Sequence, residues 1–232
     1  MSNTVLLPAG KGYSCTVYPA MDLVDQDTLY KLMTVPTLLV NFKNKQPGFF
    51  HVEKLGTDAI RCEFLGLNTK EIKTISDDGL AVQEVTCADT AELLIMLSKK
   101  MVLTSGNEGA AKSGLYHLAN CASLVCKPEK PQQAALLKLL DAAIKIWSVK
   151  YTNIKHTELK EVTFKGALDE RFPMAGDISN SDVAMCDVAA DLNPHGVWGI
   201  RVSKEGRIVI RKNTKQAITV ELLASVLTTI FG

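Results

Sequence analysis

The sequence predicts an α+β protein with a β-rich N-terminal portion of antiparallel strands, a helical centre, and a C-terminal β-hairpin followed by a helix. Short β-prone runs separated by turn formers extend to about residue 87. Apolar residues then recur at helical spacing, and two β-prone runs around a glycine turn precede an amphipathic C-terminal segment. With 47% hydrophobic and 22% charged residues among 232, the chain is typical of a globular protein with a sizeable core.

The N-terminal portion predicts a flexible arm, a strand and a short helix before the sheet. Apolar residues 5–7 are followed by a proline and two glycines, and residues 13–18 are typical of a strand. Asp25 and Asp27 are suitable caps for a helix that must end before Pro36. The strands expected next are residues 37–42, 48–54, 59–65, 71–75 and 80–85.

The middle of the chain predicts helices on both sides of a linker. Asp89 followed by Glu92 resembles a capping box for a helix over residues 89–103, and a second helix is expected at about 110–126. Two prolines within residues 127–131 predict the boundary between an N-terminal lobe, 1–126, and a C-terminal lobe, 131–232. The second lobe is expected to hold a core helix over 134–149, a strand at 162–165, an acidic loop with a short helix to 192, the hairpin and the closing helix.

The hairpin and the residues after it carry a local positive charge, because residues 201–215 contain six basic residues and one acidic residue. Residues 197–202 and 207–211 flank a turn that contains Gly206, and alternation places Trp198 with the other apolar residues on one face. We expect the arginines of the hairpin on the opposite face, where they can make forked hydrogen bonds to phosphates. The predicted nucleic-acid-binding residues are Arg201, Lys204, Arg207, Arg211, Lys212 and Lys215. The simpler alternative is a solvated hairpin whose charges protect an exposed sheet edge.

An acidic segment directly precedes this basic hairpin. Its carboxylates are Asp169, Glu170, Asp177, Asp182, Asp187 and Asp191. If the acidic and basic surfaces face apart, copies of the chain can stack head to tail. If they face each other within one molecule, both stacking and phosphate binding are weakened.

The sequence contains one approximate phosphate-binding loop. Gly106–Ser113 resembles the Walker motif, but Ala111 occupies the position of its second glycine, which the backbone needs to wrap phosphates. A turn between two helices is the simpler interpretation. A nucleotide-dependent enzyme therefore remains an alternative function.

The remaining candidate sites have simpler structural interpretations. His117, Cys121 and Cys126 fit a metal site poorly because no fourth ligand is evident, and Asp77 and Asp78 before a glycine are typical of a turn. We therefore assign no catalytic residue, metal or cofactor from the sequence.

These observations favour binding and assembly over catalysis. The six cysteines show no disulfide framework, and the chain starts without a secretory signal, so we expect the cytoplasm, another reducing compartment or the inside of a virus particle. No membrane span is expected. The sequence predicts a self-assembling structural protein of the coat or nucleocapsid type that binds the backbone of RNA or DNA. An intracellular adaptor without catalytic activity is the further alternative.

Overall fold

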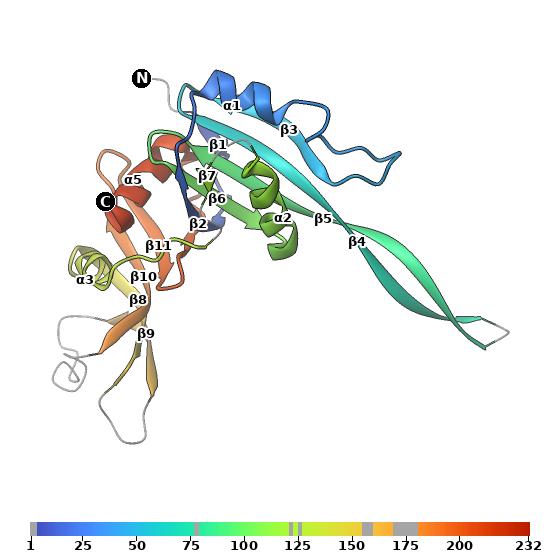
Figure 1. Cartoon of the computed structure of the whole chain (residues 1–232). Helices are drawn as coiled ribbons and strands as arrows, with labels where there is room; N and C mark the ends of the chain where they lie inside the picture. The colour runs from blue at the N-terminus through green and yellow to red at the C-terminus, as the bar shows by residue number, and fades with distance from the viewer. Residues whose placement is uncertain (1–3, 77–78, 121–122, 125–126, 155–159, 169–180) are drawn as a thin grey trace. The chain divides into compact units, whose positions relative to one another are not determined.

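The computed structural model of the chain (Figure 1) describes all residues except 1–3, 77–78, 121–122, 125–126, 155–159 and 169–180. The chain divides into two compact units. Unit 1 comprises residues 1–17 and 128–232, and unit 2 comprises residues 18–127. Both contain antiparallel strands and helices, with strands predominating, so the broad α+β prediction is confirmed.

Unit 2 contains a sheet with the strand order β3-β4-β5-β6. Its strands are β3 (Gly48–Leu55), β4 (Ala59–Ser76), β5 (Gly79–Met96) and β6 (Met101–Gly106), and β7 (Ser123–Leu124) pairs with the second half of β2 (Tyr13–Met21). The helix α1 (Gln26–Met33) is capped by Asp25, as predicted. The helix α2 (Glu108–Leu118) packs against β4, β5 and β6.

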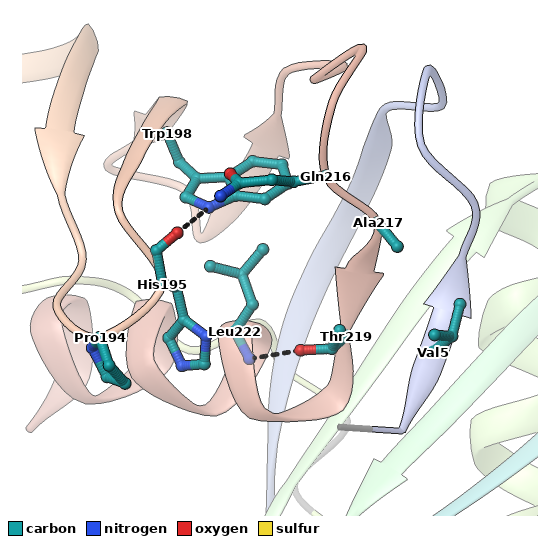
Figure 2. Close-up of a pocket in the computed structure, with 8 residues that line it drawn as sticks. All are labelled: Val5, Pro194, His195, Trp198, Gln216, Ala217, Thr219 and Leu222. Carbon is teal, nitrogen blue, oxygen red and sulfur yellow. Dashed lines mark hydrogen bonds between the residues drawn. The ribbon is translucent and has the colours of Figure 1, made fainter. Parts of the chain in front are cut away.

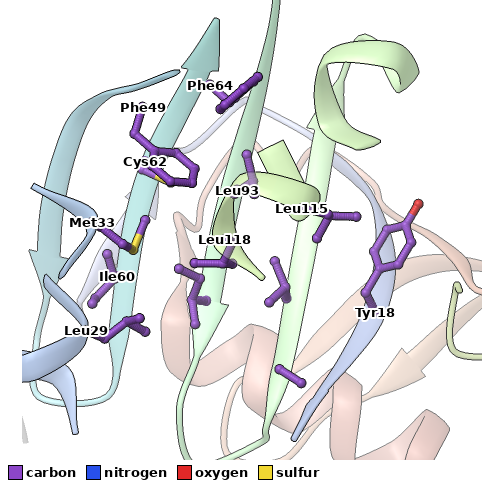
Figure 3. Packing of buried hydrophobic residues seen from close by; sticks show 13 residues of the cluster. Tyr18, Leu29, Met33, Phe49, Ile60, Cys62, Phe64, Leu93, Leu115 and Leu118 are labelled. Atoms are coloured by element: carbon purple, nitrogen blue, oxygen red, sulfur yellow. The ribbon is translucent and has the colours of Figure 1, made fainter. Parts of the chain in front are cut away.

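The core of unit 2 forms between this sheet and its helices. Figure 3 shows Phe49 and Phe64 beside aliphatic residues of β5 and α2, and the two phenyl rings meet edge to face with centroids 5.5 Å apart. Gly114 lets α2 approach this cluster closely, because a Cβ there would lie 3.0 Å from both Leu93 Cδ1 and Phe64 Cγ. The glycine is thus required by helix–sheet packing.

The strands β4 and β5 also form a long two-stranded ribbon. They pair continuously from Ala59 opposite Met96 to Ser76 opposite Gly79, far beyond the ends of their neighbours β3 and β6. Figure 1 shows the distal part of the ribbon extending away from α1 and α2. In this part neither face of the ribbon is covered by another element among the described residues of unit 2.

In unit 1, antiparallel strands pair in the order β2-β12-β11-β10-β8-β9. Its further strands are β8 (Ala143–Thr152), β9 (Glu161–Leu168), β10 (Asp182–Asp191), β11 (Val197–Ser203) and β12 (Arg207–Ile210). The helix α3 (Gln133–Asp141) packs against β8, β10 and α5 (Val220–Phe231). The predicted hairpin and closing helix are therefore present.

The N-terminal residues pair with the C-terminal part of unit 1. The strand β1 (Val5–Leu7) pairs with β13 (Ile218–Thr219), and the backbone N–H of Thr4 donates to the carboxylate of Glu221 at 3.1 Å. Residues 5–7, which were expected to be part of a flexible arm, thus form one strand of a small two-stranded sheet.

Several predicted helices were wrong, and long apolar runs explain most of the errors. Residues 89–96 belong to β5 and residues 101–103 to β6, with a turn between them, and four consecutive residues of β5, Leu93–Met96, are fully buried. Such a run is compatible with either a buried helix or a buried strand. Here it forms a strand because it pairs with β4. Residues 143–149 likewise form part of β8, so the helix expected over 134–149 ends at Asp141.

Other boundaries also needed correction. Residues 182–191, expected as loop and short helix, form β10 between β8 and β11. The helix expected at 110–126 ends at Leu118. The strand expected at 37–42 is replaced by turns, with isolated bridges at Leu39 and Asn41.

Candidate nucleic-acid interface

The predicted basic hairpin forms β11 and β12, and the alternation expected from its sequence is present. Trp198, Ile200 and Val202 are at most 2% exposed, whereas Arg201 and Arg207 are exposed on the opposite face. The turn needs Gly206, because its φ is +84° and a Cβ there would lie 1.9 Å from the carbonyl oxygen of Glu129.

The cross-strand register places Arg201 in a row that runs across the unit 1 sheet. Arg201 lies opposite Asp187 of β10 on one side and Val209 of β12 on the other. Asp187 lies opposite Ser148 of β8, and Val209 lies opposite Ser14 of β2. We use the name basic face for this row, Ser148–Asp187–Arg201–Val209–Ser14, together with Trp147, Gly199 and the predicted basic residues Lys204, Arg207, Arg211, Lys212 and Lys215.

Asp187 is the centre of the basic face. Its side chain is only 1% exposed, and it accepts hydrogen bonds from Nε and Nη2 of Arg201 at 3.0 and 2.7 Å. Arg211 donates through Nε at 3.0 Å and through Nη2 at 2.5 Å. Burial disfavours the charged form, but the hydrogen bonds from Arg211 and Arg201 outweigh it and hold the pKa of Asp187 below its usual value. The same contact raises the pKa of Arg211.

Arg211 is held from a second side by Trp147. The guanidinium carbon lies 4.7 Å from the centroid of the indole ring, a cation–π contact. Trp147 is the extra residue of a bulge in β8, since Ser148 lies opposite Asp187 and Ile146 lies opposite Val188. The Arg211 side chain crosses Gly199, where a Cβ would lie 2.7 Å from Arg211 Cδ.

Arg201 and Arg211 remain accessible although both are paired with Asp187. The side chains of Arg201 and Arg211 are 45% and 44% exposed, and one carboxylate between two guanidinium groups leaves a local charge of +1. Arg207 donates from Nε and Nη2 to Ser14 Oγ, each at 3.4 Å. Lys204, Lys212 and Lys215 are exposed in the hairpin turn and in the segment after β12.

The acidic segment meets the basic hairpin within unit 1. Asp187 pairs with Arg201 and Arg211, and Asp182 accepts a hydrogen bond from the side chain of Asn153. Asp191 is exposed at the end of β10. Asp169, Glu170 and Asp177 lie outside the described residues. For Asp187, the structure shows the arrangement that the sequence analysis regarded as unfavourable to free arginines.

The Walker-like segment does not have the shape of a phosphate loop. Gly106 ends β6 and α2 begins at Glu108, so Lys112 and Ser113 lie inside a helix. Asn107 caps the helix by accepting from the N–H of Ala110 at 3.0 Å, and Lys112 pairs with Glu108 at 2.7 Å. The backbone N–H groups of Ala110 and Ala111 are therefore used within the helix and its cap.

Of the remaining candidate ligands, the structure describes only His117. Nδ1 of His117 lies 3.0 Å from the carbonyl oxygen of Ser113, and its ring packs on Phe49 and Phe64. Cys121, Cys126, Asp77 and Asp78 lie outside the described residues. Within the described part of the chain, no three histidine, cysteine or acidic side chains are grouped to hold a metal ion.

Unit 1 also contains a pocket beside the two-stranded sheet. Figure 2 shows its lining, which combines apolar and polar side chains around a volume of about 360 Å³. The lining residues are Val5, Pro194, His195, Trp198, Gln216, Ala217, Thr219 and Leu222. Trp198 donates from Nε1 to the carbonyl oxygen of His195 at 3.0 Å, and Thr219 caps α5 through the N–H of Leu222.

Sequence reasoning missed three residues of the basic face. It grouped Asp187 with a diffuse acidic segment, left Trp147 in a core helix, and gave Gly199 no role. Gly199 did carry a signal, because a glycine inside a strand often marks the close approach of another group. Nothing in the local sequence around Asp187 indicates that it faces Arg211.

Comparison with known proteins places the chain in no established family. No protein-family model matches the sequence. No curated protein matches it significantly. Among the described helices, none has both the length and the apolar character needed to cross a membrane.

Proposed function

We propose that this protein is a self-assembling structural protein whose basic face binds the sugar–phosphate backbone of a nucleic acid. The observation that carries the proposal is the clamp formed by Asp187 on Arg201 and Arg211. It fixes two guanidinium groups side by side while leaving each nearly half exposed.

Pairing with Asp187 reduces the free positive charge of Arg201 and Arg211, but two features of the clamp still support phosphate binding. A single carboxylate neutralises only one of the two arginines, so the cluster keeps a positive charge that attracts phosphate. Because Asp187 and Trp147 already restrict the Arg211 side chain, a ligand meets a preorganised donor and less side-chain entropy is lost on binding. Arg207 extends the positive charge along the hairpin.

The aromatic residues support contact with the backbone rather than with bases. One face of Trp147 is occupied by Arg211, and Trp198 is only 2% exposed. Tyr151 packs edge to face on Phe164, with centroids 6.2 Å apart. Base recognition by single-strand-binding proteins depends on open aromatic platforms, so these residues favour binding with little sequence preference.

The variants used in the test must leave Asp187, Arg201 and Arg211 unchanged. Reversing the charge of Arg201 or Arg211 would leave Asp187 buried without its partner and would confuse unfolding with loss of binding. We therefore suggest replacing Lys204, Arg207, Lys212 and Lys215 together by glutamine. A matched control replaces four exposed lysines of unit 2, Lys31, Lys43, Lys45 and Lys100, by glutamine.

Binding to a fluorescein-labelled single-stranded RNA of mixed sequence is then measured by anisotropy at several salt concentrations. Each lost phosphate contact should reduce the slope of log affinity against log salt by about 0.7. We expect a weaker and less salt-dependent affinity for the basic-face variant and no change for the control. Equal affinity and slope for the wild type and the basic-face variant would overturn the proposal.

A further inference from the structure

The loop before β2 lies beside the segment that follows β12. The backbone N–H of Gly10 donates to the carbonyl oxygen of Asn213 at 2.6 Å, which continues the antiparallel register of β2 and β12 beyond the strand ends. In this register Lys11 lies directly opposite Lys212. The loop thus adds a basic residue to which the sequence analysis gave no role.

The two lysines have no carboxylate partner in their own strands. Neither residues 4–21 nor residues 206–220 contain an acidic residue. Lys11 and Lys212 are both exposed, and neither forms an ion pair with a described residue. Like charges in directly opposite positions of an antiparallel pair repel each other, so this end of the sheet carries two positive charges at a cost in stability.

The carboxylates of neighbouring elements are occupied or lie elsewhere. Asp187 accepts hydrogen bonds from two arginines, and Glu221 accepts the backbone N–H of Thr4. Asp191 ends β10, and β11 lies between β10 and β12. Glu205 lies in the hairpin turn, at the opposite end of β12. The charge of the lysine pair is therefore unmatched within the described residues of unit 1.

A pocket of about 290 Å³ adjoins the lysine pair. It is lined from β2, β12 and the residues next to them by Gly12, Tyr13, Ser14, Val209, Ile210, Arg211 and Lys212. Part of this lining is apolar, and the cationic residues Arg211 and Lys212 lie beside it. Such a mixture fits a sugar–phosphate unit, because the ribose carbons can contact the apolar part while the phosphate meets the cations.

We propose that one phosphate of the bound nucleic acid lies between Lys11 and Lys212, beside Arg211. The phosphate replaces the repulsion between the two lysines by two attractions, with each ammonium group acting as a point charge. This inference rests on the proposed function and extends its interface from the hairpin to the N-terminal loop. The nucleic acid therefore continues past the end of β12 over residues 8–12.

The experiment compares Lys11→Gln, Lys212→Gln and the double variant with the wild type, using the labelled RNA and the salt series described above. The matched control is Lys138→Gln, an exposed lysine of α3, a helix to which no binding residue is assigned. Each single variant should bind RNA about fivefold more weakly at low salt, the effect of losing one charge pair in water. The control should bind like the wild type.

The double variant tests whether the two lysines share one phosphate. For a single strand, the slope of log affinity against log salt falls by about 0.7 for each phosphate that is no longer neutralised. A shared phosphate predicts a total loss of about 0.7 in the double variant, whereas two separate phosphates predict about 1.4. The larger loss would overturn the shared contact.

The stability of the free protein gives a second readout. Because Lys11 and Lys212 repel each other when no phosphate is bound, Lys11→Gln should leave the midpoint of thermal unfolding unchanged or raise it. A lower midpoint would show that Lys11 has a stabilising partner within the protein, and it would overturn the proposal.

The outcomes separate this contact from the proposed function. Wild-type affinity of Lys11→Gln, together with weak binding by the four-residue basic-face variant, would overturn the phosphate contact and leave the proposed function in place. A wild type that binds no RNA would overturn both.

Discussion

The guanidinium carbon of Arg211 lies 4.7 Å from the ring centroid of Trp147, and the arginine side chain crosses Gly199 to reach it. The same guanidinium donates two hydrogen bonds to Asp187. The arginine is thus held between an aromatic ring and a carboxylate, and it lies over Gly199, which has no side chain. This arrangement restricts the orientation of the Arg211 side chain on the basic face.

Gly199 should tolerate no larger residue. In Gly199→Val the new side chain would overlap Arg211 Cδ and Trp147 Cη2, which lie 2.7 and 3.1 Å from the position of a Cβ. We expect a loss of about 1–3 kcal/mol in the free energy of unfolding, typical of overpacking, and a change in tryptophan fluorescence. Urea unfolding measures the first, with Val197→Ala, an exposed position of the same strand, as control. Unchanged stability and fluorescence would contradict the packing described here.

Asp187 should be required for stability at neutral pH. Asp187→Asn keeps the shape of the side chain but leaves two guanidinium groups without their carboxylate. Removing one partner of a buried ion pair typically costs about 3–5 kcal/mol, and the exposure of the arginines places the expected loss near the lower limit. Thermal and urea unfolding should show the loss, whereas Asp191→Asn, at an exposed position, should have little effect.

The contribution of Asp187 should depend on pH with a defined sign. Its pKa in the folded protein lies below the value of about 3.9 expected in the unfolded chain. The stabilisation is therefore fully present above that unfolded value and is lost as the pH falls through the folded pKa. We expect the stability difference between the wild type and Asp187→Asn to be constant from neutral pH down to about pH 5 and to shrink below about pH 4. A difference that grows in acid would contradict the assignment.

Gly114 provides a test of the core of unit 2. Replacing a mid-helix glycine by alanine normally stabilises an exposed helix by about 1 kcal/mol. Here the added Cβ would lie 3.0 Å from Leu93 and Phe64, so Gly114→Ala should destabilise the protein instead. Denaturant unfolding gives the sign directly, with Ser113→Ala in the same helix as reference. A gain in stability would show that α2 can move away from the sheet.

The sequence by itself determined the parts of the structure that depend on local patterns. Turn geometry explains the hairpin around Gly206, and the two-residue period of a strand explains the alternation of Trp198 with Arg201. A hydrogen bond within a few residues explains the cap at Asp25. The closing helix follows from its apolar spacing. The sequence also identified the residues that make the basic face positive.

Only the tertiary structure decided which secondary structure the long apolar runs form and which charged residues pair with each other. Leu93–Met96 is buried on all sides, and a run of that kind specifies burial without specifying helix or strand until β4 pairs beside it. In the same way, Asp187 and Arg211 are 24 residues apart, so only the strand order of unit 1 brings them together. Electrostatic pairing depends on the distance between two side chains in space, and their separation along the sequence does not give that distance. The arginines predicted to be free are therefore shared with a buried carboxylate.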